Sequence, residues 1–396
     1  MMSKKSPQLR FEGFTDDWEE RKLSDIADRF DNLRVPITAS DRKPGDTPYY
    51  GANGIQDYVE GFTHNGEFIL VAEDGANDLK NYPVQYVNGK VWVNNHAHVL
   101  QGKKTITDNK FLMNAIKNFT IEPFLVGGGR AKLNADVMMK LNILLPTFVE
   151  QEKNGSLFSL LDKTIALHQR KLDLLKEQKK GYLQKMFPKN GAKVPELRFS
   201  GFADDWEERK LGELLKSAYQ GINTAGDKVI YSEKGVEILQ SKHITSGYIT
   251  FDDTRFLDKK RYSEYFPKYV PKKHDILFAN IGTIGPSTVV ETNKEFLIAW
   301  NILKMTPNEN VNSKFIELFL QILNEKHYYE KITTGNATKF VNKDAILNIE
   351  LCTSSFKEQQ KIGSFFQQLD NTIALHQRKL DLLKEQKKGF LQKMFV

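Results

Sequence analysis

Apolar residues return every three or four positions in two long segments of the chain, which is the spacing of one face of an α-helix. The spacing alternates regularly between three and four, as in the heptad seam of a coiled coil. The first seam consists of Ile165, His168, Leu172, Leu175, Lys179, Tyr182 and Met186, and the second of Ile373, His376, Leu380, Leu383, Lys387, Phe390 and Met394. Two long helices that pair with each other are therefore predicted.

The two helical segments are near copies. Thr164 to Phe187 reads TIALHQRKLDLLKEQKKGYLQKMF, and Thr372 to Phe395 differs from it only by Phe390 in place of Tyr182. A globular domain lies between them in the sequence, so the simplest pairing is antiparallel, about a pseudo-two-fold axis. Lysines at the seam positions 179 and 387 weaken such a pair but help to fix its register. Leu167, Leu174 and Leu183 widen the apolar stripe, which indicates a contact beyond the partner helix.

A second repeat opens each half of the chain. LRFEGFTDDWEERKL at Leu9 to Leu23 returns as LRFSGFADDWEERKL at Leu197 to Leu211, whereas the stretches that follow barely resemble each other. Both inserts contain short apolar runs bounded by turn residues, which predict strands. These runs are EFILVAEDG, KVWVNNHAHVL, DILFANIGTIG and EFLIAWNILKM, while KFIELFLQILNEKHYYEKI at Lys314 to Ile332 predicts a helix.

The predicted fold class is mixed α/β (α+β), with two globular domains separated by an antiparallel pair of long helices. We expect a first domain at residues 1–149, a central helix at 150–189, a linker and second domain at 190–357, and a C-terminal helix at 358–396. The polar segment PKNGAKVP, bracketed by prolines, marks the end of the first helix. Two constant frames with two divergent inserts indicate one scaffold that presents two different recognition surfaces.

Charge favours a polyanionic partner. The formal net charge is +7 and the pI is about 9.0. Nine Lys or Arg residues and only three acidic ones lie between Asp162 and Lys193. Each helical repeat of 24 residues spans roughly 36 Å, about the length of one turn of B-DNA. A solvated helix face is the usual explanation of such a charge run, and the heptad taken alone favours a simple oligomerisation coiled coil. The matching N-terminal frames and the twin inserts argue against that simpler interpretation.

The chain offers little for membrane insertion, export or catalysis. No apolar run approaches the length of a bilayer span, and no apolar signal segment follows the basic N-terminus. A single cysteine excludes an intramolecular disulfide and fits a reducing cytoplasm. GTIGPST and GGG lack the remaining residues of nucleotide-binding fingerprints. His96 and His98 would share a strand face, but no further Cys or His cluster completes a metal site, so we predict no metal.

The repeated motifs resemble those of one family. The opening LRF-x-GF-x-x-x-WEERKL and the helical block E-Q-x-x-x-G-x-x-F-x-x-x-D-x-x-IALHQRKLDLLKEQKKG, which starts at Glu150 and again at Glu358, resemble the specificity subunits of type I restriction-modification systems. The resemblance covers essentially the whole chain. It implies two target recognition domains, each reading one half of a split, asymmetric site in double-stranded DNA.

The resemblance also implies partner subunits, which carry out the chemical reactions. Family members bind two methyltransferase (modification) subunits, which transfer a methyl group from S-adenosylmethionine to adenine N6. Restriction subunits complete a complex that uses ATP and Mg to cleave unmodified DNA. No Asn/Asp-Pro-Pro-Tyr/Phe tetrapeptide occurs in this chain, so we expect a non-catalytic subunit without a cofactor of its own, in the cytoplasm and with no membrane partner.

Candidate DNA contacts are polar residues on turns or strand ends, where donors reach phosphates or base edges. We select Tyr50, Asn53, Asn95, His96, Arg130 and Lys132 in the first domain, and Lys242, His243, Thr283, Asn336, Thr338 and Lys339 in the second. The segments GGGRAKLNADVMMKLNILLP and TTGNATKFVNKDAILNIELC occupy matching places in the two halves. The loops around Arg130 and Thr338 are therefore the preferred DNA-facing elements.

Two other functional classes fit the same sequence. A stand-alone, two-headed DNA-binding adaptor or regulator would also be basic and duplicated, but it would bind DNA equally well without modification subunits. An enzyme with an unrecognised site would show activity as an isolated chain. The sequence leaves these alternatives open, along with the target bases and the length of the unread spacer.

Overall fold

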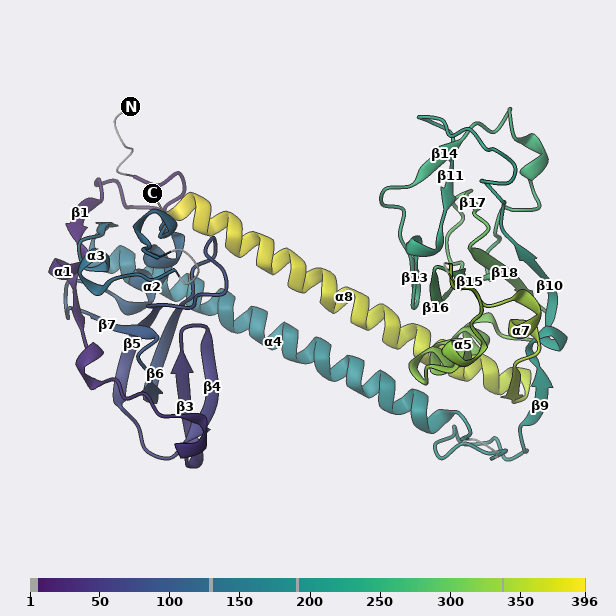
Figure 1. The fold of residues 1–396 in the computed structure, drawn as a ribbon, viewed down its shortest axis with the longest axis horizontal. Coiled ribbons are helices and arrows are strands. Elements are labelled where there is room, and N and C mark those ends of the chain that lie inside the picture. Colours follow the sequence, from purple (N-terminus) through teal and green to yellow (C-terminus); the bar gives the residue numbers. More distant parts are fainter. Residues whose placement is uncertain (1–5, 128–130, 190–191, 337, 396) are drawn as a thin grey trace. The chain divides into compact units, whose positions relative to one another are not determined.

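The computed structural model describes residues 6–127, 131–189, 192–336 and 338–395. The chain divides into two compact units, Met1–Arg170 with Arg378–Val396, and Lys171–Gln377. Both divisions fall inside the two longest helices, α4 (Phe148–Met186) and α8 (Phe356–Met394). Each unit therefore holds a mixed α/β domain and one part of each long helix, and the predicted fold class is confirmed (Figure 1).

The two long helices run antiparallel within each unit. In the first unit, Asp162 of α4 forms an ion pair with Lys387 of α8, and Phe158 packs against Phe395. In the second unit, Lys179 lies 2.7 Å from Asp370, and the ring of Tyr182 meets that of Phe365. Within each unit, the partner on α8 thus lies earlier in the sequence as the position on α4 lies later. Both lysines of the predicted seam form ion pairs with carboxylates of the other helix. These ion pairs favour the antiparallel orientation of the two helices.

Burial along the predicted seam is graded. Leu172, Leu175, Met186, Leu380 and Met394 are buried, while Ile165, His168, Lys179, Tyr182, Ile373, His376, Leu383, Lys387 and Phe390 are half-buried. Leu183 is buried in the core of the second unit, whereas the side chains of Leu167 and Leu174 are 66% and 51% exposed. These two leucines widen the apolar stripe of α4, and their side chains remain exposed in this structure.

Each domain core is closed by a phenylalanine from the repeat that belongs to the other half of the sequence. Phe395, directly after α8, stacks on Phe111 at 5.4 Å between ring centroids and meets the edge of Trp18. Phe187, directly after α4, stacks on Phe315 at 5.2 Å and meets Trp206. The C-terminal end of α8, drawn in yellow, lies among the purple and blue elements of the first unit (Figure 1).

The first unit contains a six-stranded sheet in the order β2-β7-β5-β6-β3-β4 and a small sheet of β1 and β8. Its strands are β1 (Glu19–Lys22), β2 (Ala27–Arg29), β3 (Pro44–Gly51), β4 (Gly54–Val59), β5 (His64–Ala72), β6 (Val84–Val93), β7 (Ala97–Gly102) and β8 (Asn142–Leu145). Its shorter helices are α1 (Leu23–Ile26), α2 (Asn109–Asn118) and α3 (Ala135–Met138), with 3-10 turns at Asp31–Leu33 (η1), Ala39–Asp41 and Glu122–Phe124.

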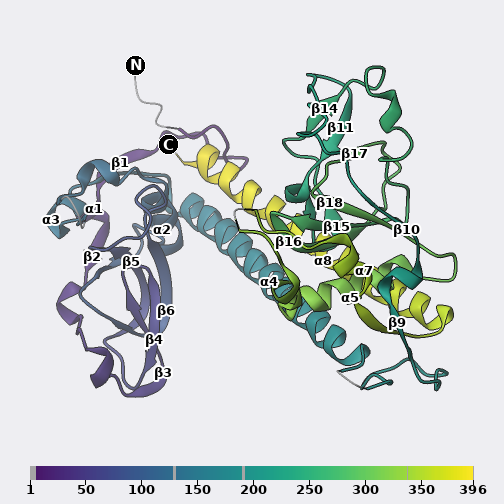
Figure 2. The ribbon, with the colours of Figure 1, turned by 45° about the vertical axis from the view of Figure 1, so that its right-hand side comes forward.

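The second unit repeats this plan with additions. It contains sheets in the orders β10-β18-β15-β16 and β14-β11-β17, whose strands are labelled in Figure 2. Two further sheets pair β12 with β13 and β19 with β9. The strands are β9 (Glu207–Lys210), β10 (Leu215–Gln220), β11 (Val236–Leu239), β12 (Ile244–Thr245), β13 (Tyr248–Ile249), β14 (Arg255–Leu257), β15 (Ile276–Ile281), β16 (Thr283–Val289), β17 (Leu297–Ile298), β18 (Ile302–Pro307) and β19 (Glu350–Thr353). The helices are α5 (Ser313–Glu325), α6 (Tyr328–Ile332) and α7 (Lys343–Leu347), with 3-10 turns at Leu211–Leu214, Ser241–His243 (η5) and Ser263–Tyr265.

The central strands of the two domains share one register. The run ILVA in β5 faces residues 100, 99, 98 and 97 of β7, and the run ILFA in β15 faces residues 305, 304, 303 and 302 of β18. The parallel pairing of β3 with Trp92 and Val93 returns as that of β11 with Leu297 and Ile298. Two inserts that barely resemble each other in sequence thus pair their central strands in the same register.

Period-2 alternation explains why these short apolar runs are central strands. Ile69 and Val71 face the core that contains α2 and Trp18, whereas Phe68 and Leu70 face a second core on the other side of the sheet. In β15, Ile276 and Phe278 likewise face one core, and Leu277 and Ala279 face another on the opposite side of the sheet.

Four element predictions need correction. KVWVNNHAHVL and EFLIAWNILKM each contain two strands rather than one, because the chain turns between β6 and β7 and between β17 and β18. DILFANIGTIG likewise forms the hairpin β15–β16. The predicted helix Lys314 to Ile332 breaks between α5 and α6, where His327 has a left-handed φ of 56°. Among the described residues, no helix has the length and apolar content of a membrane span.

A buried ion pair ties each N-terminal frame to its helix. The guanidinium of Arg10 contacts both carboxylate oxygens of Glu150 at 2.9 and 2.8 Å, and Arg198 contacts those of Glu358 at 2.7 and 2.8 Å. Both glutamate side chains are only 1% exposed. Removal of either arginine would leave a buried carboxylate without its charged partner.

We expect Arg10→Ala and Arg198→Ala each to lower the free energy of unfolding by about 3–5 kcal/mol, because each leaves an uncompensated buried charge. Arg21→Ala is the matched control, since Arg21 pairs with Glu19 on the surface and such pairs contribute roughly 0–1 kcal/mol. Urea unfolding followed by tryptophan fluorescence measures all three. Arginine variants as stable as the Arg21 variant would contradict the structural role of these pairs.

Candidate functional site

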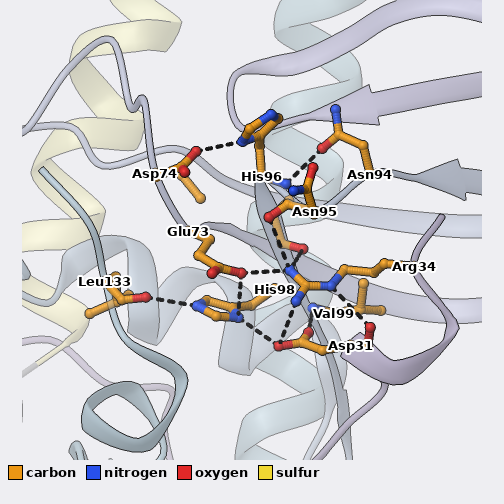
Figure 3. Close-up of polar contacts among 12 residues, drawn as sticks. Asp31, Arg34, Glu73, Asp74, Asn94, Asn95, His96, His98, Val99 and Leu133 are labelled. Atoms are coloured by element: carbon orange, nitrogen blue, oxygen red, sulfur yellow. Dashed lines mark hydrogen bonds and ion pairs between the residues drawn. The ribbon is translucent and has the colours of Figure 1, made fainter. Parts of the chain in front are cut away.

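A cluster of charged side chains lies at the end of the central strands of the first domain. Glu73 directly follows β5, His98 lies in β7, and Asp31 begins the turn η1 after β2. These strands are neighbours in the order β2-β7-β5. The sheet therefore brings together residues that are far apart in the sequence (Figure 3).

Arg34 joins the two carboxylates of the cluster. Its guanidinium lies 2.7 Å from Glu73 and 3.5 Å from Asp31, and it donates a hydrogen bond of 2.9 Å to the carbonyl oxygen of Ala97. His98 is 1% exposed; its Nδ1 lies 2.7 Å from Asp31, and its Nε2 lies 2.8 Å from the carbonyl oxygen of Leu133. Figure 3 shows these side chains converging from separate elements. The cluster is a nearly closed network of ion pairs.

Both carboxyl groups are held in their charged form. Burial on its own would raise the pKa of Asp31, but hydrogen bonds from His98 and the Val99 amide outweigh it and leave the pKa below its ordinary value. Burial acts in the same direction on Glu73, where hydrogen bonds from Lys132 and Arg34 outweigh it and lower the pKa. At neutral pH the network therefore contains two carboxylates and the cations that neutralise them.

The network is attached to the segment that precedes α3. Lys132 pairs with Val126 through two backbone hydrogen bonds of 2.9 and 2.8 Å, and the Leu133 amide donates to the carbonyl oxygen of Glu73 at 2.7 Å. The Lys132 ammonium lies 2.8 Å from the carboxylate of Glu73, and its side chain is 45% exposed. Glu73 thus holds both the backbone and the side chain of this segment.

The predicted first-domain residues are placed around this cluster. Lys132 belongs to it, and His96, beside it, lies 2.6 Å from Asp74 and donates its backbone amide to Asn94 (Figure 3). Asn95 is exposed next to His96. Asn53 donates to the carbonyl oxygen of Gly75 and accepts from the Asn77 amide, so it supports the loop after β5. Tyr50 is half-buried in β3, and burial raises the pKa of its hydroxyl. Arg130 lies outside the described residues.

The second domain carries an uncharged counterpart of the cluster. By strand register, Asn280 of β15 corresponds to Glu73, and Gln220 of β10 corresponds to Asp31. Gln220 and Asn280 exchange side-chain hydrogen bonds of 2.9 and 3.2 Å, and Asn280 also donates to the carbonyl oxygen of Val341. Thr334 and Phe340 form the same two-bond backbone pair as Val126 and Lys132. The two segments predicted to match are therefore closed in the same way.

The predicted second-domain residues fall into two groups. Thr283, Asn336, Thr338 and Lys339 are all exposed, and the Gly282 amide donates to the carbonyl oxygen of Lys339, which brings the start of β16 to this segment. Lys242 forms a surface ion pair with Asp253. His243 is 2% exposed, and its Nδ1 accepts from the Gln240 amide to cap η5. The selection of His243 as a DNA contact needs correction, because its ring is committed to the domain interior.

Asp31, Arg34 and Glu73 were missed at the sequence level, and His98 was named only as a strand neighbour of His96. The expected shared strand face is wrong, because His96 lies in the turn before β7. A signal for Glu73 existed, since ILVAEDG and ILFANIG share a pattern of apolar residues that ends in a polar residue and a glycine. The ligand-type atoms of Asp31, Glu73 and His98 lie within 4.8 Å of one another. In this structure Arg34 forms ion pairs with both carboxylates, and Lys132 with that of Glu73.

Comparisons with known proteins agree with one another. The model of the type I restriction modification DNA specificity domain matches residues 15–177 and again 203–385. A Haemophilus influenzae protein described as a type I restriction enzyme specificity subunit is 31% identical over 379 residues, which cover 91% of this chain and 90% of the relative. The MjaVIII specificity subunit of Methanocaldococcus jannaschii is 23% identical over 402 residues, which cover 95% of this chain and 91% of that subunit.

Solved structures show the same fold. The crystal structure of a type I restriction-modification S subunit from M. genitalium matches with a TM-score of 0.73 at 15% identity, over 99% of both chains. A chain from a study of complex assembly and conformational transition of a type I system matches with a TM-score of 0.51 at 14% identity, over 97% of this chain and 99% of the other.

Asp31→Asn is expected to lower the thermal midpoint by about 5 °C at pH 7, because hydrogen bonds to a charged group contribute about 1.5–3 kcal/mol. A carboxyl group whose pKa is lowered by folding stabilises the fold above its unfolded pKa of about 4, and that contribution is lost as the pH falls through the folded pKa. The difference between variant and wild type should therefore shrink from pH 5 to pH 3.

Thermal unfolding across this pH range tests the expectation, with Asp28→Asn as control, because Asp28 is exposed in the adjacent strand β2. A difference between Asp31→Asn and wild type that stays constant with pH would show that charge on Asp31 contributes nothing.

Proposed function

The chain belongs to the family of type I restriction-modification DNA specificity subunits, and from this premise we propose that it reads a bipartite, asymmetric site in double-stranded DNA. Each domain reads one half-site, and unread base pairs separate the two. The chain is the non-catalytic component of its system. Methyl transfer and cleavage belong to partners.

One observation carries the proposal: the same central strand pairing occurs in both domains, with unlike side chains around the paired segment at the end of these strands. We call this end of the strands, with its paired segment, the reading edge. The central strands β5 and β7 pair in the same register as β15 and β18. The segment at the end of these strands, however, carries Lys132 in the first domain and Phe340 at the corresponding position of the second. A common frame with different surface chemistry is what two unlike half-sites require. Bidentate contacts at about 1–3 kcal/mol each supply much of the roughly 4–10 kcal/mol that distinguishes specific from non-specific binding.

Exposed leucines support the recruitment of two copies of one partner. Leu167 and Leu174 on α4 are 66% and 51% exposed, and their repeat equivalents Leu375 and Leu382 on α8 are 65% and 58% exposed. Large apolar side chains repeated in this way on a helix surface are typical of a protein interface. We assign these positions to two methyltransferase subunits, bound in equivalent ways to the two helices.

The partners supply the cofactors in this scheme. S-adenosylmethionine binds to the modification subunits, which methylate adenine N6, and ATP with Mg acts in restriction subunits that cleave unmodified DNA. The subunit acts where cellular DNA is present, in the cytoplasm of its host.

Mapping of methylated adenines in a genome that carries this chain and its modification partner tests the proposal. We expect a motif of two different half-sites of about three or four base pairs, separated by a fixed number of unread positions, and its loss when the gene for this chain is deleted. An uninterrupted motif, or methylation that persists after deletion, would exclude the proposed role.

The partner surface gives a separate prediction. Leu167→Asp and Leu375→Asp should each reduce the number of bound modification subunits from two to one, and the double variant should bind none, because each introduces a charge into one of two equivalent apolar contacts. The mass of the purified complex gives the count. Leu160→Asp is the control, since Leu160 is 63% exposed but its repeat equivalent is Gln368. Loss of both copies from a single variant would contradict two equivalent sites.

A further inference from the structure

Glu73 contacts several residues of the reading edge at once. It holds Lys132 by an ion pair of 2.8 Å and Arg34 by one of 2.7 Å, and its backbone carbonyl accepts from the Leu133 amide. The Glu73 side chain is 13% exposed, whereas that of Lys132 is 45% exposed. An inner carboxylate thus fixes an outer ammonium group that is free to meet a ligand on its exposed side.

We propose that Glu73 is a positioning residue for half-site reading by the first domain, and that it acts by fixing Lys132 at the edge of the sheet. The inference rests on the proposed function, because it takes DNA as the ligand. A lysine held at one point loses less conformational freedom on binding a phosphate or a base edge than a mobile one. The exposed part of Lys132 can donate to either acceptor.

The second domain holds its paired segment from the same register position, but by a different interaction. Asn280 stands at the register position of Glu73 and donates to the carbonyl oxygen of Val341, while Val341 donates its amide to the carbonyl oxygen of Asn280. The residue that corresponds to Lys132 is Phe340, which is 36% exposed. The second domain therefore fixes its paired segment by amide hydrogen bonds and presents an apolar ring instead of a cation.

The protein segments that read the two half-sites are consequently held in place by different physical interactions. In the first domain, three charged positions at 31, 73 and 132 form part of one network. In the second domain, the corresponding positions 220, 280 and 340 carry Gln, Asn and Phe. Removal of charge from position 73 should change the reading of one half-site only. Loss of the amide donor at position 280 should change the reading of the other half-site.

The experiment uses the complex of the full chain with its modification subunits. Binding is measured for duplexes that carry the wild-type methylation motif and for duplexes with single base changes in one half-site or the other. Glu73→Gln should weaken discrimination in one half-site by about tenfold, in line with the loss of a charge-assisted contact. Asn280→Asp should do so in the other half-site. Glu67→Gln is the matched control, because Glu67 is exposed in the same strand β5.

A double-mutant cycle distinguishes positioning from a general structural effect. If Glu73 acts through Lys132, then Glu73→Gln should add little to Lys132→Met, since the group that it fixes is already absent. Additive effects of the two substitutions, or an equal loss of discrimination in both half-sites, would overturn the proposal. So would unchanged discrimination in Glu73→Gln. Failure of the wild-type complex to prefer any duplex would instead contradict the proposed function itself.

Discussion

The structure depends on the antiparallel pairing of α4 and α8, because each domain is completed by a helix end from the other half of the sequence. Phe395 closes the core around Trp18, and Phe187 closes the core around Trp206. The seam ion pairs of Lys387 with Asp162 and of Lys179 with Asp370 give the pairing its direction. Neither core can therefore be assembled fully from its own half, so the two halves are linked through packing as well as through the chain.

This constraint explains why the frames are constant while the inserts diverge. Residues such as Arg10, Glu150 and their equivalents Arg198 and Glu358 are buried and paired, so change there is penalised in either half. At the edge of the central sheet, the same backbone pairing is combined with different sets of paired side chains in the two domains. The first domain fills that edge with carboxylates and cations, and the second fills it with amides and a phenyl ring. Different surfaces are thus compatible with one frame, as a two-part recognition protein requires.

The helical frame could be predicted from the sequence because its signals are local and occur twice. Heptad spacing gave both helices, and PKNGAKVP gave the end of the first. The strand runs were found as well, but the turns inside them at residues 94–96 and 299–301 were missed, since apolar residues flank the turns on both sides. The network of Asp31, Glu73 and His98 could not be predicted, because it depends on the order of strands in a sheet. His243 was selected for its residue type, although burial decides its role.

Hydrogen exchange on Phe395→Ala tests the central claim most directly, with Phe187→Ala as its repeat equivalent. If each core is closed by the other half, Phe395→Ala should reduce amide protection in residues 18–26 and 109–116 of the first domain and leave residues 206–214 and 313–320 of the second unchanged. Phe187→Ala should give the reverse pattern. Loss of protection in the second domain on removal of the Phe395 ring would contradict the account.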